Sequence, residues 1–188
     1  MVKQFFIFVL AVGIHSDVMA QTFGELLSKK DSVGAVAMIK KGTDVNAVDN
    51  NGTSPLMNAC RWADDWSVSF LLRHGAKADN PKSPKGRTPL MIGCAYYSGV
   101  GICRMLIDHG ANVNAVAQDN ITPLMLAAHN AKLDVVELLL KKGANPKVRD
   151  AAGKTAWDYA SKADVSEYLT KSVKDTRVDK QGVMELLK

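Results

Sequence analysis

Apolar runs and polar turn residues alternate along most of the chain at a regular spacing. A Ser or Thr begins four of the apolar segments, at positions 54, 88, 122 and 155, and a glycine ends four others, at positions 42, 75, 110 and 143. In LDVVELLLKKG (133–143) the apolar residues fall on one stripe at helical spacing, and the final glycine suits the left-handed turn that closes a helix. The pattern predicts pairs of short helices repeated along the chain.

The first helix of each pair is marked by a four-residue head. Its hydroxyl residue accepts a backbone N–H that the first turn leaves unpaired, and the proline after it suits the first helical position, where a missing N–H costs nothing. The leucine then packs inward. The four heads are SPLM (54–57), TPLM (88–91), TPLM (122–125) and TAWD (155–158).

A T-P-L-H-x-A head that returns about every 33 residues is the signature of ankyrin repeats. The chain resembles this family over nearly all of its length after residue 20, because the heads and the closing glycines recur in phase. The resemblance implies an all-α fold, an ankyrin-repeat solenoid of paired antiparallel helices with β-turn loops. The family usually places His after T-P-L, whereas this chain has Met57, Met91 and Met125, which we expect in the core.

The expected organisation follows from the phase of the repeat. An N-terminal capping repeat (21–48) should hold helices at about 25–28 and 33–40, and repeats over 49–171 should begin near 49, 83, 117 and 150. The segment 172–188 is expected to be a C-terminal cap or a tail, and the residues leave both alternatives open.

The first twenty residues are predicted to be a secretory signal peptide. Lys3 precedes an apolar run over 5–14, and small or apolar residues at 18–20 form a cleavage site before Gln21. The apolar run is shorter than the roughly 20 residues needed to span a bilayer. We therefore expect cleavage after Ala20, a periplasmic location in a bacterium, and no membrane attachment of the mature chain.

Charge and cysteine content change this picture little. The formal net charge is +5, and removal of the leader takes away one basic and one acidic residue, so the balance stays the same. The basic residues are spread along the chain and do not favour nucleic acid as a partner. Cys60 and Cys94 replace the second alanine of an Ala-Ala pair, which predicts buried core thiols, while a disulfide between Cys94 and Cys103 is the less favoured alternative.

The sequence holds no pattern typical of catalysis. The Ser, Cys, His and carboxylate residues match no nucleophile, phosphate-binding or metal-binding motif. We therefore expect neither enzyme activity nor a cofactor, a metal or a catalytic residue.

The resemblance implies a protein-binding surface made of the loop tips and the exposed side of each first helix. Carried over position by position, that surface includes aromatic and basic side chains, residue types enriched at binding hot spots. The expected partner-binding residues are Arg61, Trp62, Arg87, Tyr96, Tyr97, Ile121, His129, Asn130 and Lys154.

Export and the family resemblance together suggest a function. The chain is similar to small periplasmic ankyrin proteins that protect against exported enzymes or support them. The first expectation is a monomeric self-protection (immunity-type) inhibitor that binds a folded partner, an exported cell-wall peptidoglycan hydrolase. The alternatives are a supporting partner of a periplasmic oxidative-stress enzyme such as catalase, and a secreted effector that binds a host protein.

Overall fold

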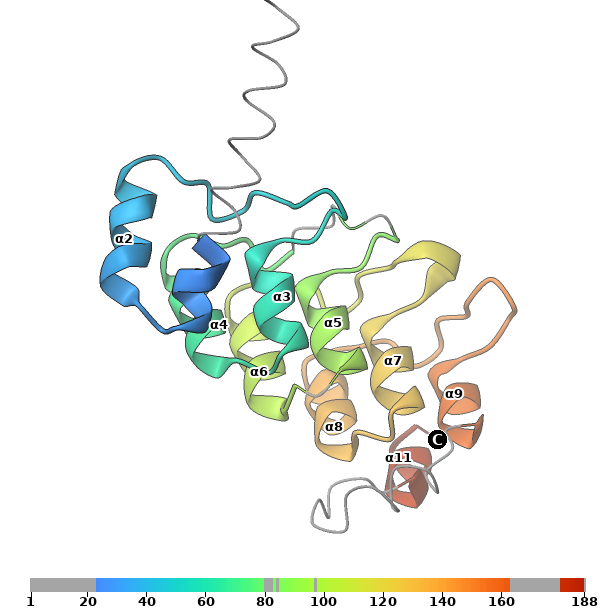
Figure 1. Ribbon diagram of the computed structural model, residues 1–188. Helices are drawn as coiled ribbons and strands as arrows, with labels where there is room; N and C mark the ends of the chain where they lie inside the picture. The colour runs from blue at the N-terminus through green and yellow to red at the C-terminus, as the bar shows by residue number, and fades with distance from the viewer. Residues whose placement is uncertain (1–22, 80–82, 84, 97, 163–179, 188) are drawn as a thin grey trace, which may run out of the picture.

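The computed structural model describes residues 23–79, 83, 85–96, 98–162 and 180–187. Within these ranges the chain folds into short helices joined by turns and loops, without a strand. Antiparallel helix pairs stack side by side, and long loops project from one edge of the stack (Figure 1). The predicted all-α fold is confirmed.

Three of the described pairs share the same lengths, an inner helix of seven residues followed by an outer helix of nine. These pairs are α3 (Pro55–Arg61) with α4 (Asp65–Arg73), α5 (Pro89–Ala95) with α6 (Val100–Asp108), and α7 (Pro123–His129) with α8 (Leu133–Lys141). A helix over 23–28 and α2 (Ser32–Lys40) precede them, and α9 (Ala156–Lys162) and α11 (Lys180–Leu186) follow. A short 3-10 helix, η1 (Gln118–Asn120), lies in the loop before α7.

The inner helices begin where the heads predict. The hydroxyl of Ser54 accepts the N–H of Met57 at 3.2 Å, and threonines 88 and 122 cap the next two inner helices in the same way. In the last head the bonds run in the other direction, because the N–H and the hydroxyl of Thr155 both donate to Oδ2 of Asp158, at 2.7 and 2.8 Å. The head therefore starts a helix even where alanine replaces proline.

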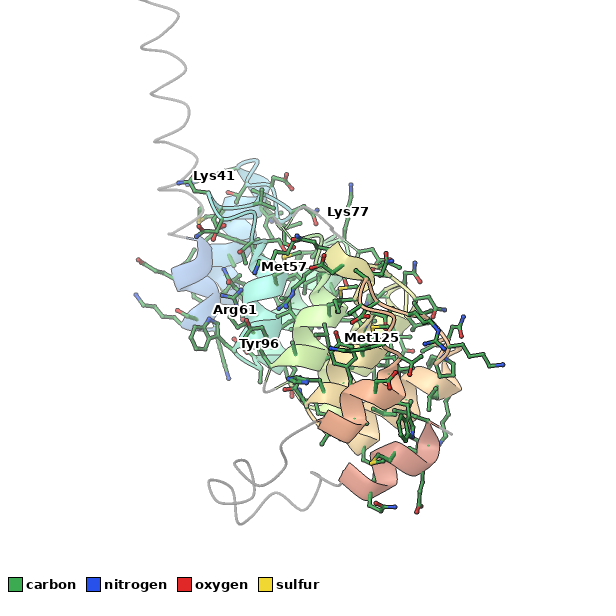
Figure 2. The ribbon with its side chains drawn as sticks, turned by 90° about the vertical axis from the view of Figure 1, so that its right-hand side faces the viewer. Lys41, Met57, Arg61, Lys77, Tyr96 and Met125 are labelled. Atoms are coloured by element: carbon green, nitrogen blue, oxygen red, sulfur yellow. The ribbon has the colours of Figure 1, made fainter. Side chains whose placement is uncertain are left out.

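The core runs through the stack between the inner and outer helices. Met57, Met91 and Met125 are almost fully buried, which confirms that they pack in the core. A single repeat cannot bury its own apolar face, so the stacking of neighbours makes the core continuous. Figure 2 shows two of these methionines within the stack, whereas Lys41 and Lys77 extend from its loop edge into solvent.

Both ends of the stack are covered. Phe23 and Leu27, in the 23–28 helix, are buried against the first full repeat. At the other end α11 packs against α8 and α9, and the following Leu187 is buried, so the described part of the tail docks as a cap. The expected leader (1–20), its cleavage site and residues 163–179 lie outside the described residues.

The loops before the inner helices close in equivalent ways near the positions where repeats are expected to begin. Asp49 donates its N–H to the Thr53 carbonyl at 3.0 Å. In the second loop the side chain of Ser83 takes over, because its Oγ accepts the N–H of Arg87 at 2.6 Å. The backbone bond returns in the later loops, between Ala117 and Ile121 and between Asp150 and Lys154.

Asparagine side chains tie neighbouring loops together. Asn46 donates its amide to the carbonyl of Gly75 at 3.0 Å and accepts the N–H of Lys77 at 2.8 Å. Each such residue satisfies backbone groups that two separate loops would leave unpaired. The same two bonds recur further along the row of loops, where Asn114 donates to the Gly143 carbonyl and accepts the N–H of Asn145.

One position in this row differs. Asp79 stands in the place of Asn46 and Asn114, and its Oδ2 accepts the N–H of Asn112 at 2.8 Å. A carboxylate has no N–H with which to reach the Gly110 carbonyl, the counterpart of the glycine carbonyls that the asparagines bind. Oδ1 of Asp79 is buried and has no hydrogen-bond partner among the described residues.

Candidate protein-binding surface

The expected surface residues divide between the two ends of the inner helices. A seven-residue helix is about 10 Å long, so the two groups are separated by roughly that distance along each repeat. One group precedes the caps, on the loop side of the stack: Arg87, Ile121 and Lys154. The other lies at the C-terminal ends of the inner helices, in the last helical residue or directly after it: Arg61, Trp62, Tyr96, His129 and Asn130. Tyr97 lies outside the described residues.

Arg61, Trp62 and Tyr96, here called the aromatic patch, lie at the ends of α3 and α5. The Arg61 guanidinium is placed over the Tyr96 ring, with Cζ 5.4 Å from the ring centroid, a favourable cation–π position. Figure 2 shows the two side chains beside each other. Trp62 is 78 % exposed and Tyr96 is 36 % exposed. The patch thus joins two repeats and leaves most of an indole open to a partner.

A groove adjoins the patch on the side of the N-terminal helix. It has a volume of about 780 Å³ and extends from the 23–28 helix across the loop at 47–53 to α3. Leu27, Pro55, Asn58 and Trp62 are among its lining residues. A concave, partly apolar groove beside an exposed Trp is the kind of surface that takes a protruding element of a partner. The sequence pattern alone did not identify Leu27 and Asn58 as lining residues of this groove.

Lys132 fixes the turn that carries Tyr96. Its ammonium donates to the carbonyls of Gly93 at 3.1 Å, Ser98 at 3.2 Å and Tyr96. The pKa of Lys132 is lowered, chiefly because burial disfavours its charged form. Lys132 is the residue before α8, and Asp64 caps α4 from the corresponding place. A lysine there cannot cap a helix, and this departure is the sequence signal that could have identified Lys132.

The remaining residues of the end group interact within the stack. The His129 ring meets the edge of Tyr159, with centroids 6.0 Å apart, and the Tyr159 hydroxyl donates to Oδ2 of Asp150 at 2.8 Å. The Asn130 amide donates to the Leu126 carbonyl at 2.8 Å, so it closes its own helix. These residues lie two helix pairs away from Trp62, at the α7 end of the same face.

The loop-side group lies away from the aromatic patch. Arg87, Ile121 and Lys154 are all half-buried, and each directly precedes an inner helix. The structure thus brings Arg61, Trp62 and Tyr96 together and leaves Arg87 at the other end of the inner-helix face. A partner that touches both groups must cover the length of an inner helix.

The described part of the chain offers neither a metal-binding cluster nor a membrane-spanning helix. It holds no group of three or more His, Cys, Asp or Glu side chains placed to bind a metal ion. None of its helices combines the length and the apolar composition that a membrane crossing requires.

Comparison with known proteins points to one kind of architecture. Residues 26–117 match the family described as ankyrin repeats (3 copies), and residues 106–160 match ankyrin repeats (many copies). The chain is 31 % identical to human BCL-6 corepressor-like protein 1 over 133 residues, which are 71 % of this chain and 7 % of that protein.

Two further relatives cover less of the chain. A putative ankyrin repeat protein of fowlpox virus (strain NVSL) is 32 % identical over 60 % of this chain and 34 % of its own length. Ankyrin repeat and SOCS box protein 11 of Pongo abelii is 34 % identical over 62 % of this chain and 35 % of its own length. The chain thus spans about a third or less of the length of these relatives.

Proposed function

Because the chain belongs to the ankyrin-repeat family, whose repeats are protein–protein interaction modules, we propose that it binds a folded protein through the aromatic patch and the adjoining groove. The observation that carries the proposal is the exposed Trp62 beside the Arg61–Tyr96 pair. Trp, Tyr and Arg are enriched among the few residues that dominate binding energy at protein interfaces, and a partner that buries the indole gains an apolar contact without displacing core residues.

We further propose that the partner is an exported peptidoglycan hydrolase. The leader-like pattern in residues 1–20 supports this step, since it would send the chain to the compartment where such enzymes act. The basic balance of the chain and Arg87 at the loop edge favour a partner with an acidic rim, because opposite charges speed encounter.

Binding would inhibit by obstruction. A packed helical stack needs little reordering when it binds, so more of the contact energy is available as affinity. When the hydrolase is bound across the inner-helix face, the stack would cover its active-site cleft. Its substrate, a large polymer, could then not enter. Such an inhibitor acts in a fixed ratio with the enzyme and undergoes no turnover.

The experiment is a titration of purified 21–188 into a wall hydrolase of the source organism. Release of soluble fragments from peptidoglycan should fall linearly and stop falling at a fixed molar ratio. Trp62→Ala should weaken this inhibition. Trp157→Ala is its matched control, because Trp157 is also exposed, at 39 %, but belongs to α9 at the other end of the stack. Unchanged hydrolysis at molar excess, across the exported hydrolases, would overturn the inhibitor proposal.

A further inference from the structure

A second groove, here called the outer groove, lies between α2 and α4, the two outer helices nearest the N-terminus (Figure 1). It has a volume of about 560 Å³. Its lining residues recur every three or four positions along each helix, so one face of α2 and one face of α4 form its two walls. It shares no lining residue with the groove beside Trp62 and is therefore a separate surface.

The α2 wall is apolar although it faces solvent. Val33, Val36 and Ala37 form it, and the Val33 side chain is 80 % exposed. The core side of the helix is apolar too, so that no polar side chain occurs over 33–39. A helix that is apolar on all sides is normally buried on all sides. In the described part of the chain nothing covers the Val33 side of α2.

The α4 wall is a ladder of aromatic rings. Trp66 stacks on Phe70 with ring centroids 5.2 Å apart, and Phe70 stacks on His74 at 4.1 Å. Nδ1 of His74 lies 2.8 Å from the Phe70 carbonyl oxygen, which fixes the last ring. Phe70 is buried, whereas Trp66 is half-buried and lines the groove. The ladder thus gives the groove a preformed aromatic wall along the whole of α4.

This apolar surface is specific to the N-terminal end of the stack. Val33 and Trp66 are each the second residue of their outer helix. The second residues of the other two outer helices, α6 and α8, are Gly101 and Asp134. The fold of the repeat therefore does not require a large apolar side chain at this position, and its presence on both walls of one groove points to a binding role.

The outer groove carries charge at one end. Lys40 and Arg73 line it and are the last residues of α2 and α4. These helix ends lie on the same side, because Asn46 in the loop after α2 donates to the carbonyl of Gly75, which follows α4. Among the described residues no acidic side chain lines the groove, and neither Lys40 nor Arg73 forms an ion pair. Their charges are open to the carboxylates of a partner.

We propose that the outer groove binds an amphipathic helical segment of a second protein, separate from the partner of the aromatic patch. Its apolar side chains lie between Val33 and Trp66, and its acidic residues meet Lys40 and Arg73. Helices bind apolar grooves through side chains spaced three or four positions apart. Each wall is a helix of nine residues, about 13 Å long, which matches two to three turns of a bound helix. The charge at one end fixes the direction, with the acidic end towards the loops.

The test selects peptides of about 16 residues, long enough for four helical turns, from a random phage-displayed library on purified 21–188. Counter-selection on Val33→Gln keeps the clones that need the outer groove. The 80 % exposure of Val33 means that this variant should melt like the wild type. The kept peptides should have apolar residues at helical spacing and Asp or Glu gathered at one end. Val116→Gln, which changes another exposed valine in a loop, should bind them as the wild type does.

Fluorescence anisotropy of the labelled peptides then tests the charged end. Arg73→Glu should weaken binding on the order of 10-fold, and the loss should shrink as salt is added. Lys141→Glu is the matched control, because Lys141 is the last residue of α8 as Arg73 is of α4. Trp62→Ala should leave the affinity unchanged, since Trp62 belongs to the other groove.

Three results would overturn the proposal. The first is a selection in which no clone depends on Val33. The second is a set of groove-binding peptides without acidic residues, or with affinities that Arg73→Glu leaves intact. The third is a dimer of 21–188 in analytical ultracentrifugation that Val33→Gln dissociates, because a second copy of the chain would then occupy the outer groove.

Discussion

The Arg61 guanidinium lies over the ring of Tyr96, the residue directly after the next inner helix, with 5.4 Å between Cζ and the ring centroid. The contact crosses from one repeat to the next, and Lys132 from a third repeat holds the backbone of Tyr96. Two of the three patch side chains therefore have their positions set before any partner arrives. Trp62 is the member whose side chain is mostly free.

Replacing Trp62 with alanine should weaken partner binding by about 2 kcal/mol, or roughly 30-fold in Kd. The melting temperature should change little, because the indole is 78 % exposed and removing it opens no cavity. Calorimetric titration and thermal melting measure the two effects, and Trp157→Ala should leave Kd unchanged. Normal binding together with a much lower melting temperature would mean that Trp62 serves the fold and not the interface.

Reversing the charge of Arg87 to Glu should slow association with an acidic partner and change dissociation less, because long-range attraction acts mainly on encounter. The difference in association rate between the wild type and the variant should shrink as salt is added, because salt screens the charge of residue 87 in both. Stopped-flow kinetics at two salt concentrations test this. Lys141→Glu makes the same charge change on outer helix α8 and should have a smaller effect.

Asp79→Asn should stabilise the fold by about 1 kcal/mol. An amide can donate to the Gly110 carbonyl as Asn46 does to that of Gly75, and it removes a buried oxygen without a partner in the described chain. The melting temperature should rise by roughly 2–4 °C. Asn114→Asp is the mirror experiment and should destabilise, since Asn114 now donates to Gly143. If both changes destabilise, the Asp79 carboxylate has a favourable contact that the hydrogen bonds do not explain.

Lys132→Met should cost about 1–3 kcal/mol of unfolding free energy, because three carbonyls lose their common donor while the side-chain length is kept. Lys141→Met is the control: its bond to Glu137 is a surface pair within one helix, worth well under 1 kcal/mol. Denaturant titration of both variants measures the difference. Equal, small losses would show that water replaces the Lys132 ammonium at no cost.

Stability should also depend on Tyr159 at high pH. Burial and the hydrogen bond to Asp150 raise the pKa of Tyr159 to about 12, above the ordinary value of about 10. The folded state therefore holds the Tyr159 proton more tightly than the unfolded state does. The stability that this difference contributes is complete below about pH 10 and is lost as the pH rises towards 12. Melting temperatures over this range should fall more steeply for the wild type than for Tyr159→Phe. Tyr96→Phe, which keeps the Asp150 bond, should follow the wild type.

Local features of the fold could be predicted from the sequence because their causes are local. The Ser54 cap depends on residues within one helical turn, and its hydrogen bond forms as expected. The burial of Met57 follows from its repeat phase. The described part of the first helix covers 23–28, so it includes the expected stretch 25–28 and also Phe23, which packs into the core.

The parts that could not be predicted depend on residues far apart in sequence. Lys132 meets the Gly93 carbonyl across 39 positions, and no short pattern records such a contact. Leu27 belongs to the groove only because the capping helix lies beside α3. Repeat phase placed Trp62 and Tyr96 at corresponding positions of adjacent repeats, but it also placed Arg87 beside them, and Arg87 lies at the other end of the inner-helix face. The role of the patch as a binding site stays a prediction, as do the leader and its cleavage.

In mechanical terms, the row of loops is a series of couplings of unequal stiffness. At the loop bases Asn46 and Asn114 each provide a double side-chain link to the next loop, whereas Asp79 provides a single one. Nearer the tips, the N–H of Gln118 donates to the Lys85 carbonyl at 3.0 Å and can act as a pivot. Flexing of the array should concentrate at this joint, so the curvature that a partner meets would be adjusted in the middle of the stack while both ends keep their shape.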